Sequence, residues 1–134
     1  MIPSGNTLLT TDLEVVTMPS KQHKMDLDRN LIYGTCDNLE AIKQTVFKIL
    51  NTERYAYIIY SWNYGIELKD LFGQPVMYVC PEITRRVQEA LLQDDRITAV
   101  NNFEYDISKR GVVAVKFTVH TLFGDFEEGT VVNI

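Results

Sequence analysis

Residues Val112–Thr121 read VVAVKFTVHT, and this stretch decides the fold of the chain. Its large hydrophobic side chains stand at every second position, at Val113, Val115, Phe117 and Val119. Side chains of a β-strand point alternately to opposite faces, so this spacing predicts a strand with one face in the core. The C-terminal part of the chain is therefore expected to form a sheet with one hydrophobic face.

Two further strands are expected beside this one. Ile97–Asp106 also has a period of two, and it is followed by the turn residues SKRG at positions 108–111. A final strand is expected over Phe126–Val132, after a turn with the sequence LFGD at positions 122–125. Consecutive strands joined by short turns pair antiparallel, so we predict a C-terminal β-meander.

Two amphipathic helices are predicted ahead of the meander. The first covers Leu39–Asn51, with Asp37 as its capping residue and Glu40 completing a capping box. The second begins at Pro81, which fits the first helical position, with Glu82 in the first turn. Their hydrophobic residues recur at three- and four-residue steps, at Leu39, Ile42, Val46, Ile49 and Leu50 in the first helix and at Ile83, Val87, Ala90 and Leu91 in the second.

The N-terminal part is expected to hold an arm and a hairpin. Residues 1–11 are small and polar, which indicates a flexible N-terminal arm, and Leu13–Thr17 is rich in valine, which indicates a strand. Lys21–Leu27 alternates up to a turn at residues 28–30, which leads into Leu31–Tyr33. Residues 12–134 are then predicted to form one domain.

The middle of the chain holds a group of aromatic residues. Tyr55–Trp62 reads YAYIIYSW and carries no charge, which predicts a strand or an extended run buried on both faces. An alternative is that alternate tyrosines reach a partner, because Tyr and Trp are favoured at interfaces. A short helix over Ile66–Phe72, ended by Gly73, is expected to follow.

These elements together predict an α+β fold, a small single domain in which two main helices pack on a mostly antiparallel sheet that includes the C-terminal meander. A chain of 134 residues that is 46% hydrophobic suffices for one core. Cys36 and Cys80 stand far apart and outside any metal-ligand spacing, so they are expected to be reduced, buried residues.

The charge of the chain indicates protein partners. A formal net charge of -5 gives no basic surface for nucleic acid. The apolar stretches are far shorter than a membrane span needs, so no membrane association is expected. The N-terminal residues lack the features of a secretory signal, which indicates synthesis in a cytoplasm.

The sequence offers little for catalysis, and no cofactor or metal is expected. No glycine-rich phosphate loop or nucleophile elbow occurs, and His23 and His120 stand on predicted strands as exposed histidines. Arg86 is spaced for surface ion pairs with Glu82 and Glu89, which would serve solubility. Paired carboxylates remain the one catalytic option, with Asp94 and Asp95, or Glu67 and Asp70, as candidates.

Three segments carry a resemblance to a known family. These are Tyr60–Glu67, which reads YSWNYGIE, the helix Glu82–Gln93, and Asp94–Ile97, which reads DDRI. They resemble the phage baseplate wedge family historically described as lysozyme-like. The hairpin Met25–Gly34 and the helix Leu39–Asn51 are similar to its branch in defective prophages and myophages of Gram-positive bacteria. The resemblance covers about residues 12–132.

The resemblance implies a structural component of a contractile tail and no enzyme. In the family, an aromatic-x-x-Gly run precedes the short helix, here Trp62, Tyr64 and Gly65. A Glu-Pro-Arg triplet ends the longer helix, and here it reads Asp94, Asp95 and Arg96, with Asp95 in place of proline. Implied partners are larger baseplate wedge proteins and tail sheath subunits, with tail tube and hub proteins as further candidates.

An edge strand of the predicted sheet is expected to accept a sheath arm by strand pairing and so to start sheath assembly, with Thr130, Val131 and Val132 as the contact residues. Assembly is expected in the host bacterial cytoplasm, and the mature location is the baseplate of the virion tail. Two alternatives remain. One is a peptidoglycan-degrading tail lysozyme that uses paired carboxylates, and the other is a free regulatory or ligand-binding domain.

Overall fold

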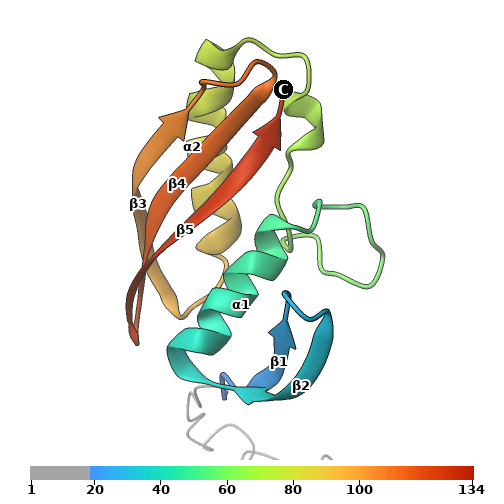
Figure 1. The fold of residues 1–134 in the computed structure, drawn as a ribbon, viewed down its shortest axis with the longest axis vertical. Helices are drawn as coiled ribbons and strands as arrows, with labels where there is room; N and C mark the ends of the chain where they lie inside the picture. The colour runs from blue at the N-terminus through green and yellow to red at the C-terminus, as the bar shows by residue number, and fades with distance from the viewer. Residues whose placement is uncertain (1–18) are drawn as a thin grey trace, which may run out of the picture.

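The computed structural model describes residues 19–134, and the order of elements is two strands, two helices and three strands (Figure 1). These are β1 (Gln22–Asp26), β2 (Leu31–Cys36), α1 (Asn38–Leu50), a short 3-10 helix (Lys69–Leu71), α2 (Val76–Leu91), β3 (Ile97–Asp106), β4 (Val112–Thr121) and β5 (Gly124–Asn133). The predicted α+β class is confirmed. The predicted arm at residues 1–11 and strand at Leu13–Thr17 lie outside the described residues.

The strands form two antiparallel sheets. The β1–β2 hairpin is one sheet, and β3, β4 and β5 form the other in that order, so β4 lies in the centre. Val113, Val115, Phe117 and Val119 of β4 are buried, as their alternation predicted. This face joins the buried residues of α1 and α2 in one hydrophobic cluster. The predicted meander and its inward face are therefore confirmed.

Helix α1 begins where it was predicted and holds the hairpin against the rest of the fold. Asp37 Oδ1 accepts a hydrogen bond from the Asn38 N–H at 2.7 Å, whereas Glu40 pairs with Lys24 at 2.7 Å, so the predicted capping box is not the arrangement found. From β1, Gln22 Nε2 donates to the Ala41 carbonyl at 2.6 Å. The hairpin thus packs on α1 through polar contacts and leaves much of β2 exposed.

Helix α2 starts one turn earlier than predicted. Pro75 is its N-cap, and the Pro75 carbonyl accepts from the N–H groups of Tyr78 and Val79 at 2.9 and 3.1 Å, while Pro81 lies inside the helix. A proline inside a helix loses one hydrogen bond. The extra turn buries Val79 completely, four residues before Ile83, which extends the hydrophobic stripe and compensates for that loss.

The prediction of a buried strand over Tyr55–Trp62 is wrong. The segment is a loop of turns, and Ile58, Ile59 and Trp62 are 103%, 85% and 81% exposed. High β-propensity stabilises a strand only when a neighbouring strand is available, and this segment pairs with none. The predicted short helix over Ile66–Phe72 reduces to the 3-10 turn Lys69–Leu71, followed by Gly73 at φ 83°.

Candidate protein-interaction surfaces

The sheet of the meander has two edges, β3 and β5, and they differ in regularity. The β3–β4 pairing shifts register twice, between Ile97 and Ala99 and between Asn101 and Glu104. The β5–β4 pairing runs through ten successive residue pairs without a shift. Because bulges disrupt an edge for pairing with another chain, β5 is the edge suited to accept a strand. The central strand β4 has no free edge.

Alternate backbone groups of β5 point away from β4. The Ile134 N–H donates to the Gly111 carbonyl at 2.9 Å. The backbone N–H and carbonyl groups of even-numbered β5 residues therefore point toward β4, and those of odd-numbered residues point outward. Consistent with this, the Gly129 N–H bonds the neighbouring Glu128 side chain at 3.1 Å. The Val131 N–H therefore points to the open edge. Its side chain is 63% exposed, whereas Val132 is buried.

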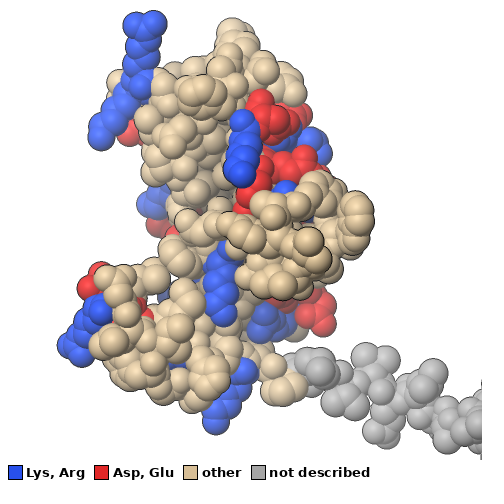
Figure 2. All heavy atoms as spheres, turned by 90° about the vertical axis from the view of Figure 1, so that its right-hand side faces the viewer, with Lys and Arg blue, Asp and Glu red and all other residues tan. Residues whose placement is uncertain are grey.

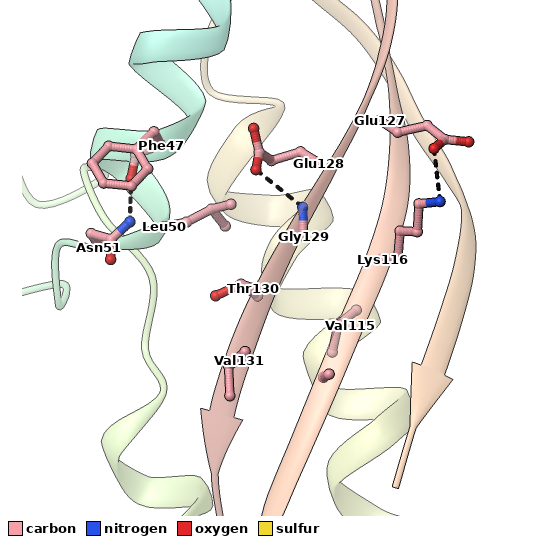
Figure 3. A pocket seen from close by; sticks show the side chains of 11 residues that line it. Phe47, Leu50, Asn51, Val115, Lys116, Glu127, Glu128, Gly129, Thr130 and Val131 are labelled. Atoms are coloured by element: carbon pink, nitrogen blue, oxygen red, sulfur yellow. Dashed lines mark hydrogen bonds and ion pairs between the residues drawn. The ribbon is translucent and has the colours of Figure 1, made fainter. Parts of the chain in front are cut away.

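A groove of about 740 Å³ lies beside this edge (Figure 3). Phe47 and Leu50 of α1, with the C-cap residue Asn51, form one wall, and residues 127–131 of β5 and 114–116 of β4 form the other. Lys116 and Glu127 pair across β4 and β5 at 2.8 Å at one end. The stretch from Gly129 to Asn133 carries no charge. The predicted contact residues Thr130 and Val131 line the groove, and Val131 and Val132 line a second hollow of about 430 Å³.

The triplet Asp94, Asp95 and Arg96 forms a compact ion pair and one exposed acid. Arg96 Nε and Nη2 donate to the two carboxylate oxygens of Asp94 at 2.9 and 2.6 Å, and both side chains are largely buried. Burial acts to raise the pKa of the Asp94 carboxyl, but the Arg96 hydrogen bonds outweigh it and hold that pKa below its usual value. Arg96 Nη2 also approaches Thr45 of α1, at 3.4 Å.

The aromatic-Gly run and the triplet meet in space. A hollow of about 320 Å³ is lined by Asn63, Tyr64 and Gly65 on one side and by Gln93 and Asp94 on the other. The two motifs that carry the family resemblance are some thirty positions apart in the sequence, yet they border the same hollow. Trp62 is not part of it, because its side chain lies on the exposed loop.

Arg86 does not simply form the surface ion pairs that its spacing predicted. Its side chain is only 10% exposed, and it bonds Glu82, both carboxylate oxygens of Asp70 and the Glu67 carbonyl. The guanidinium thereby ties the segment before α2 to the helix. Sequence reasoning missed this role, because Asp70 and Glu67 are separated from Arg86 by a turn whose path was not predictable.

In each candidate carboxylate pair, the member whose pKa is shifted, Asp70 or Asp94, is shifted downward. Hydrogen bonds from Arg86 hold the pKa of Asp70 below its usual value, and hydrogen bonds from Arg85 and Arg86 do the same for Glu82. Asp94 is shifted in the same direction. A general acid needs a raised pKa, so these side chains are suited to ion pairing and not to proton donation.

The remaining candidates have structural surroundings. His120 lies on the solvent face of the sheet, as predicted, between Asn101 at 2.9 Å and Asp125 at 3.0 Å. Cys36 and Cys80 are free thiols. Within residues 19–134, no group of His, Cys, Asp or Glu side chains could hold a metal, and no helix is long and apolar enough to cross a membrane.

Two comparisons with known proteins agree with each other. Residues 5–124 match the family model of the contractile injection system sheath initiator. The chain is also 43% identical over 124 residues to the phage-like element PBSX protein XkdS of Bacillus subtilis (strain 168), which covers 87% of this chain and 86% of that protein. The family match contains both motifs described above and ends at Gly124, where β5 begins.

Proposed function

This chain belongs to the contractile injection system sheath initiator family, and from that premise we propose that it starts the sheath of a contractile tail by accepting a sheath strand at the open edge of β5. The family and the PBSX relative confirm the resemblance to baseplate proteins of prophages from Gram-positive bacteria. The family role is structural, which agrees with the absence of raised carboxyl pKa values among the shifted acids described above.

The observation that carries the proposal is the regularity of β5. Its ten successive pairs with β4 keep the outward N–H and carbonyl groups in one unbroken register, with the groove beside them, and of these groups the Gly129 N–H is bonded to the Glu128 side chain. An added strand would gain backbone hydrogen bonds, each contributing about 0.5–1.5 kcal/mol net. Exposed Val131 would give the incoming strand a hydrophobic contact. The family match ends where β5 begins, so the proposal that β5 accepts a sheath strand is supported by the structure and not by the family match.

Contacts with larger wedge proteins are assigned in this proposal to the Asp94–Arg96 pair. Asp94 fixes the guanidinium of Arg96 in one orientation. Within residues 19–134, the Nη1 atom of Arg96 has no hydrogen-bond partner. A preorganised donor of this kind suits a carboxylate or carbonyl on a partner. Tail tube and hub proteins are further candidate neighbours. Assembly would occur in the host cytoplasm, and the chain would stay in the virion tail.

The experiment replaces one residue that points outward and one that points inward. Val131→Pro removes an N–H that faces the open edge and spares the β4 ladder, whereas Val132→Pro removes an N–H that β4 uses. Val131→Pro should therefore unfold near the wild-type urea midpoint and enter the tail. Electron microscopy should then show baseplates with tubes and no sheath.

Val132→Pro is the matched control for the fold. It should lose a ladder bond at a buried position and shift the urea midpoint strongly downward. If Val131→Pro is folded, is present in the particles and supports full-length sheath, strand addition at β5 is not the way in which the sheath starts.

A further inference from the structure

We propose that residues 55–64, the aromatic loop, form a rigid plug that seats in an uncharged, apolar pocket of a second baseplate protein. This inference rests on the proposed baseplate role, and it names a surface and a partner chemistry beyond that role. Figure 1 shows the loop projecting on the side of α1 away from the sheet.

The neck of the loop is fixed by the backbone. Glu53 and Ile66 form a parallel bridge, in which the Arg54 N–H donates to the Ile66 carbonyl at 3.1 Å and the Ile66 N–H donates to the Thr52 carbonyl at 3.0 Å. Gly65 has φ 95°, and a Cβ atom there would lie 2.6 Å from the Thr52 carbonyl oxygen. Only glycine allows the two sides of the neck to approach this closely.

Side chains reinforce the same neck. The Glu53 carboxylate accepts from the backbone N–H groups of Leu68 and Lys69 at 3.2–3.3 Å. The Arg54 side chain is 9% exposed and lies 3.1 Å from Glu89 of α2 and 3.6 Å from Glu67. The loop is therefore anchored to α2 as well as closed on itself, which is the build of an Ω-loop.

Aromatic pairs order the tip of the loop. Tyr55 and Trp62 meet edge to face at 5.8 Å, Tyr57 and Tyr60 do so at 6.1 Å, and Tyr60 stacks on Tyr64 at 4.5 Å. These contacts restrict the rings before any partner binds, and restricted aromatic side chains lose little entropy on binding.

The tip also carries apolar side chains that the fold does not use. Ile58 and Ile59 are almost fully exposed, and so is most of Trp62. Exposed apolar groups at adjacent positions on a protrusion are typical of interface anchors. Figure 2 shows this side of the molecule, where an uncharged bulge is bordered by acidic and basic side chains.

The chemistry of the loop selects a protein pocket. Residues 55–64 contain no Asp, Glu, Lys, Arg or His, so a charged pocket would bury a charge without a counterpart. Anionic lipid attracts Lys and Arg, which the loop lacks in a chain of net charge -5. On a second copy, the β5 groove is a poor match, because its walls include the charged residues Lys116, Glu127 and Glu128. An apolar pocket with backbone carbonyls for the tyrosine hydroxyls and the indole N–H fits better.

The test compares two pairs of exposed apolar residues in tail particles from cells that make the variant chain. Ile58→Ser with Ile59→Ser changes the loop, and Leu31→Ser with Ile32→Ser is the matched control on the hairpin, where the two side chains are also exposed. The ratio of chain to tube protein, measured by mass spectrometry, should fall at least about tenfold for the loop variant alone. Equal loss from both variants, or none from the loop variant, overturns the proposal.

A second measurement reads the loop directly. Trp62 is the single tryptophan of the chain. Hydroxyl-radical oxidation of Trp62 should slow several-fold when the chain is in the particle, and an unchanged rate overturns the inference. Two further measurements on the chain alone test the other possible partners of the loop. Binding to phosphatidylcholine–phosphatidylglycerol vesicles tests a lipid surface, and sedimentation equilibrium tests a second copy of the chain. Vesicle binding or dimerisation that the loop variant abolishes would also overturn it.

The outcomes separate this inference from the proposed function. If Val131→Pro supports a normal sheath while Trp62 is protected, strand addition at β5 fails and the aromatic plug stands. If Val131→Pro blocks the sheath while Trp62 keeps its free reactivity, the plug fails and strand addition stands.

Discussion

At the scale of single residues, the Asp94–Arg96 pair gives a test by pH. Arg96 lowers the folded-state pKa of Asp94 below the ordinary value of 3.8, so the pair stabilises the fold fully above that value and loses its contribution as pH falls through the folded pKa. Asp94→Asn should cost about 1–3 kcal/mol at pH 7. The difference from wild type should shrink at about pH 2.5, measured by urea unfolding.

Asp95 supplies the control for this prediction. It is the exposed acid next to Asp94, so Asp95→Asn should change stability much less at either pH. A difference between wild type and Asp94→Asn that stays constant from pH 7 downward would contradict the assigned role of the ion pair.

Gly65 and Gly34 form a matched pair of glycines. Both have positive φ, at 95° and 66°, but an alanine Cβ at Gly65 would meet the Thr52 carbonyl at 2.6 Å, whereas nothing lies within 4 Å at Gly34. Gly65→Ala should therefore destabilise the fold by roughly 1–3 kcal/mol more than Gly34→Ala does, in thermal or urea unfolding. Equal costs would mean that the neck of the aromatic loop is not closely packed.

Individual residues were predicted unevenly from the sequence. The cap at Asp37 and the buried positions of β4 follow from local spacing, so they were predictable. The hollow that the aromatic-Gly run shares with Asp94 was not predictable, because it depends on how α1 and α2 pack. Arg86 was misjudged for the same reason, since its partners include residues outside its own helix.

At the scale of elements, Arg85 and Arg86 show how burial separates two neighbouring arginines on α2. Arg86 is 10% exposed and ties the segment before α2 to the helix. Arg85 is 58% exposed, and within residues 19–134 its ion-pair partners are Glu82 and Glu89 of its own helix. Arg86→Lys should cost about 1–2 kcal/mol of unfolding free energy, because lysine cannot reproduce the planar set of donors. Arg85→Lys should leave stability almost unchanged. A larger loss of stability for Arg85→Lys than for Arg86→Lys would contradict the role of Arg86 in tying the segment before α2 to the helix.

Elements were predictable where their neighbours in sequence are also their neighbours in space. The hairpin, α1 and the meander meet this condition, and their bounds agree closely with prediction. Tyr55–Trp62 does not, because composition alone cannot tell a buried strand from an exposed aromatic loop. The start of α2 was misplaced because Pro81 suits a first helical turn but is tolerated inside this helix, where Val79 adds a buried contact.

At the scale of the whole molecule, we predict that the chain does not cut cell walls. The described acids with a shifted pKa are all shifted downward, which leaves them charged at neutral pH. Purified chain should release no dye from labelled peptidoglycan. Release that disappears in Glu67→Gln would show that the lysozyme alternative is correct.

The arrangement of the meander shows what sequence could and could not establish about the proposed contact surface. Alternation in β4 predicted a sheet with one buried face, but the choice of edge depends on strand order and register. The structure makes β4 central in the meander and gives β3 its irregular pairing, so of the two meander edges within residues 19–134, β5 is the regular one. Val131 was among the predicted contacts, and its outward N–H follows from the register together with the hydrogen bond from the Ile134 N–H to the Gly111 carbonyl.

Hydrogen exchange of β5 tests the central claim most directly. In the free chain, the amides of Thr130 and Val132 should exchange slowly because they face β4, whereas those of Val131 and Asn133 should exchange fast. Mixing with purified sheath subunits should slow exchange at Val131 and Asn133 and leave Thr130 and Val132 as they were. Sheath binding with fast exchange retained at Val131 and Asn133 would contradict strand addition at this edge.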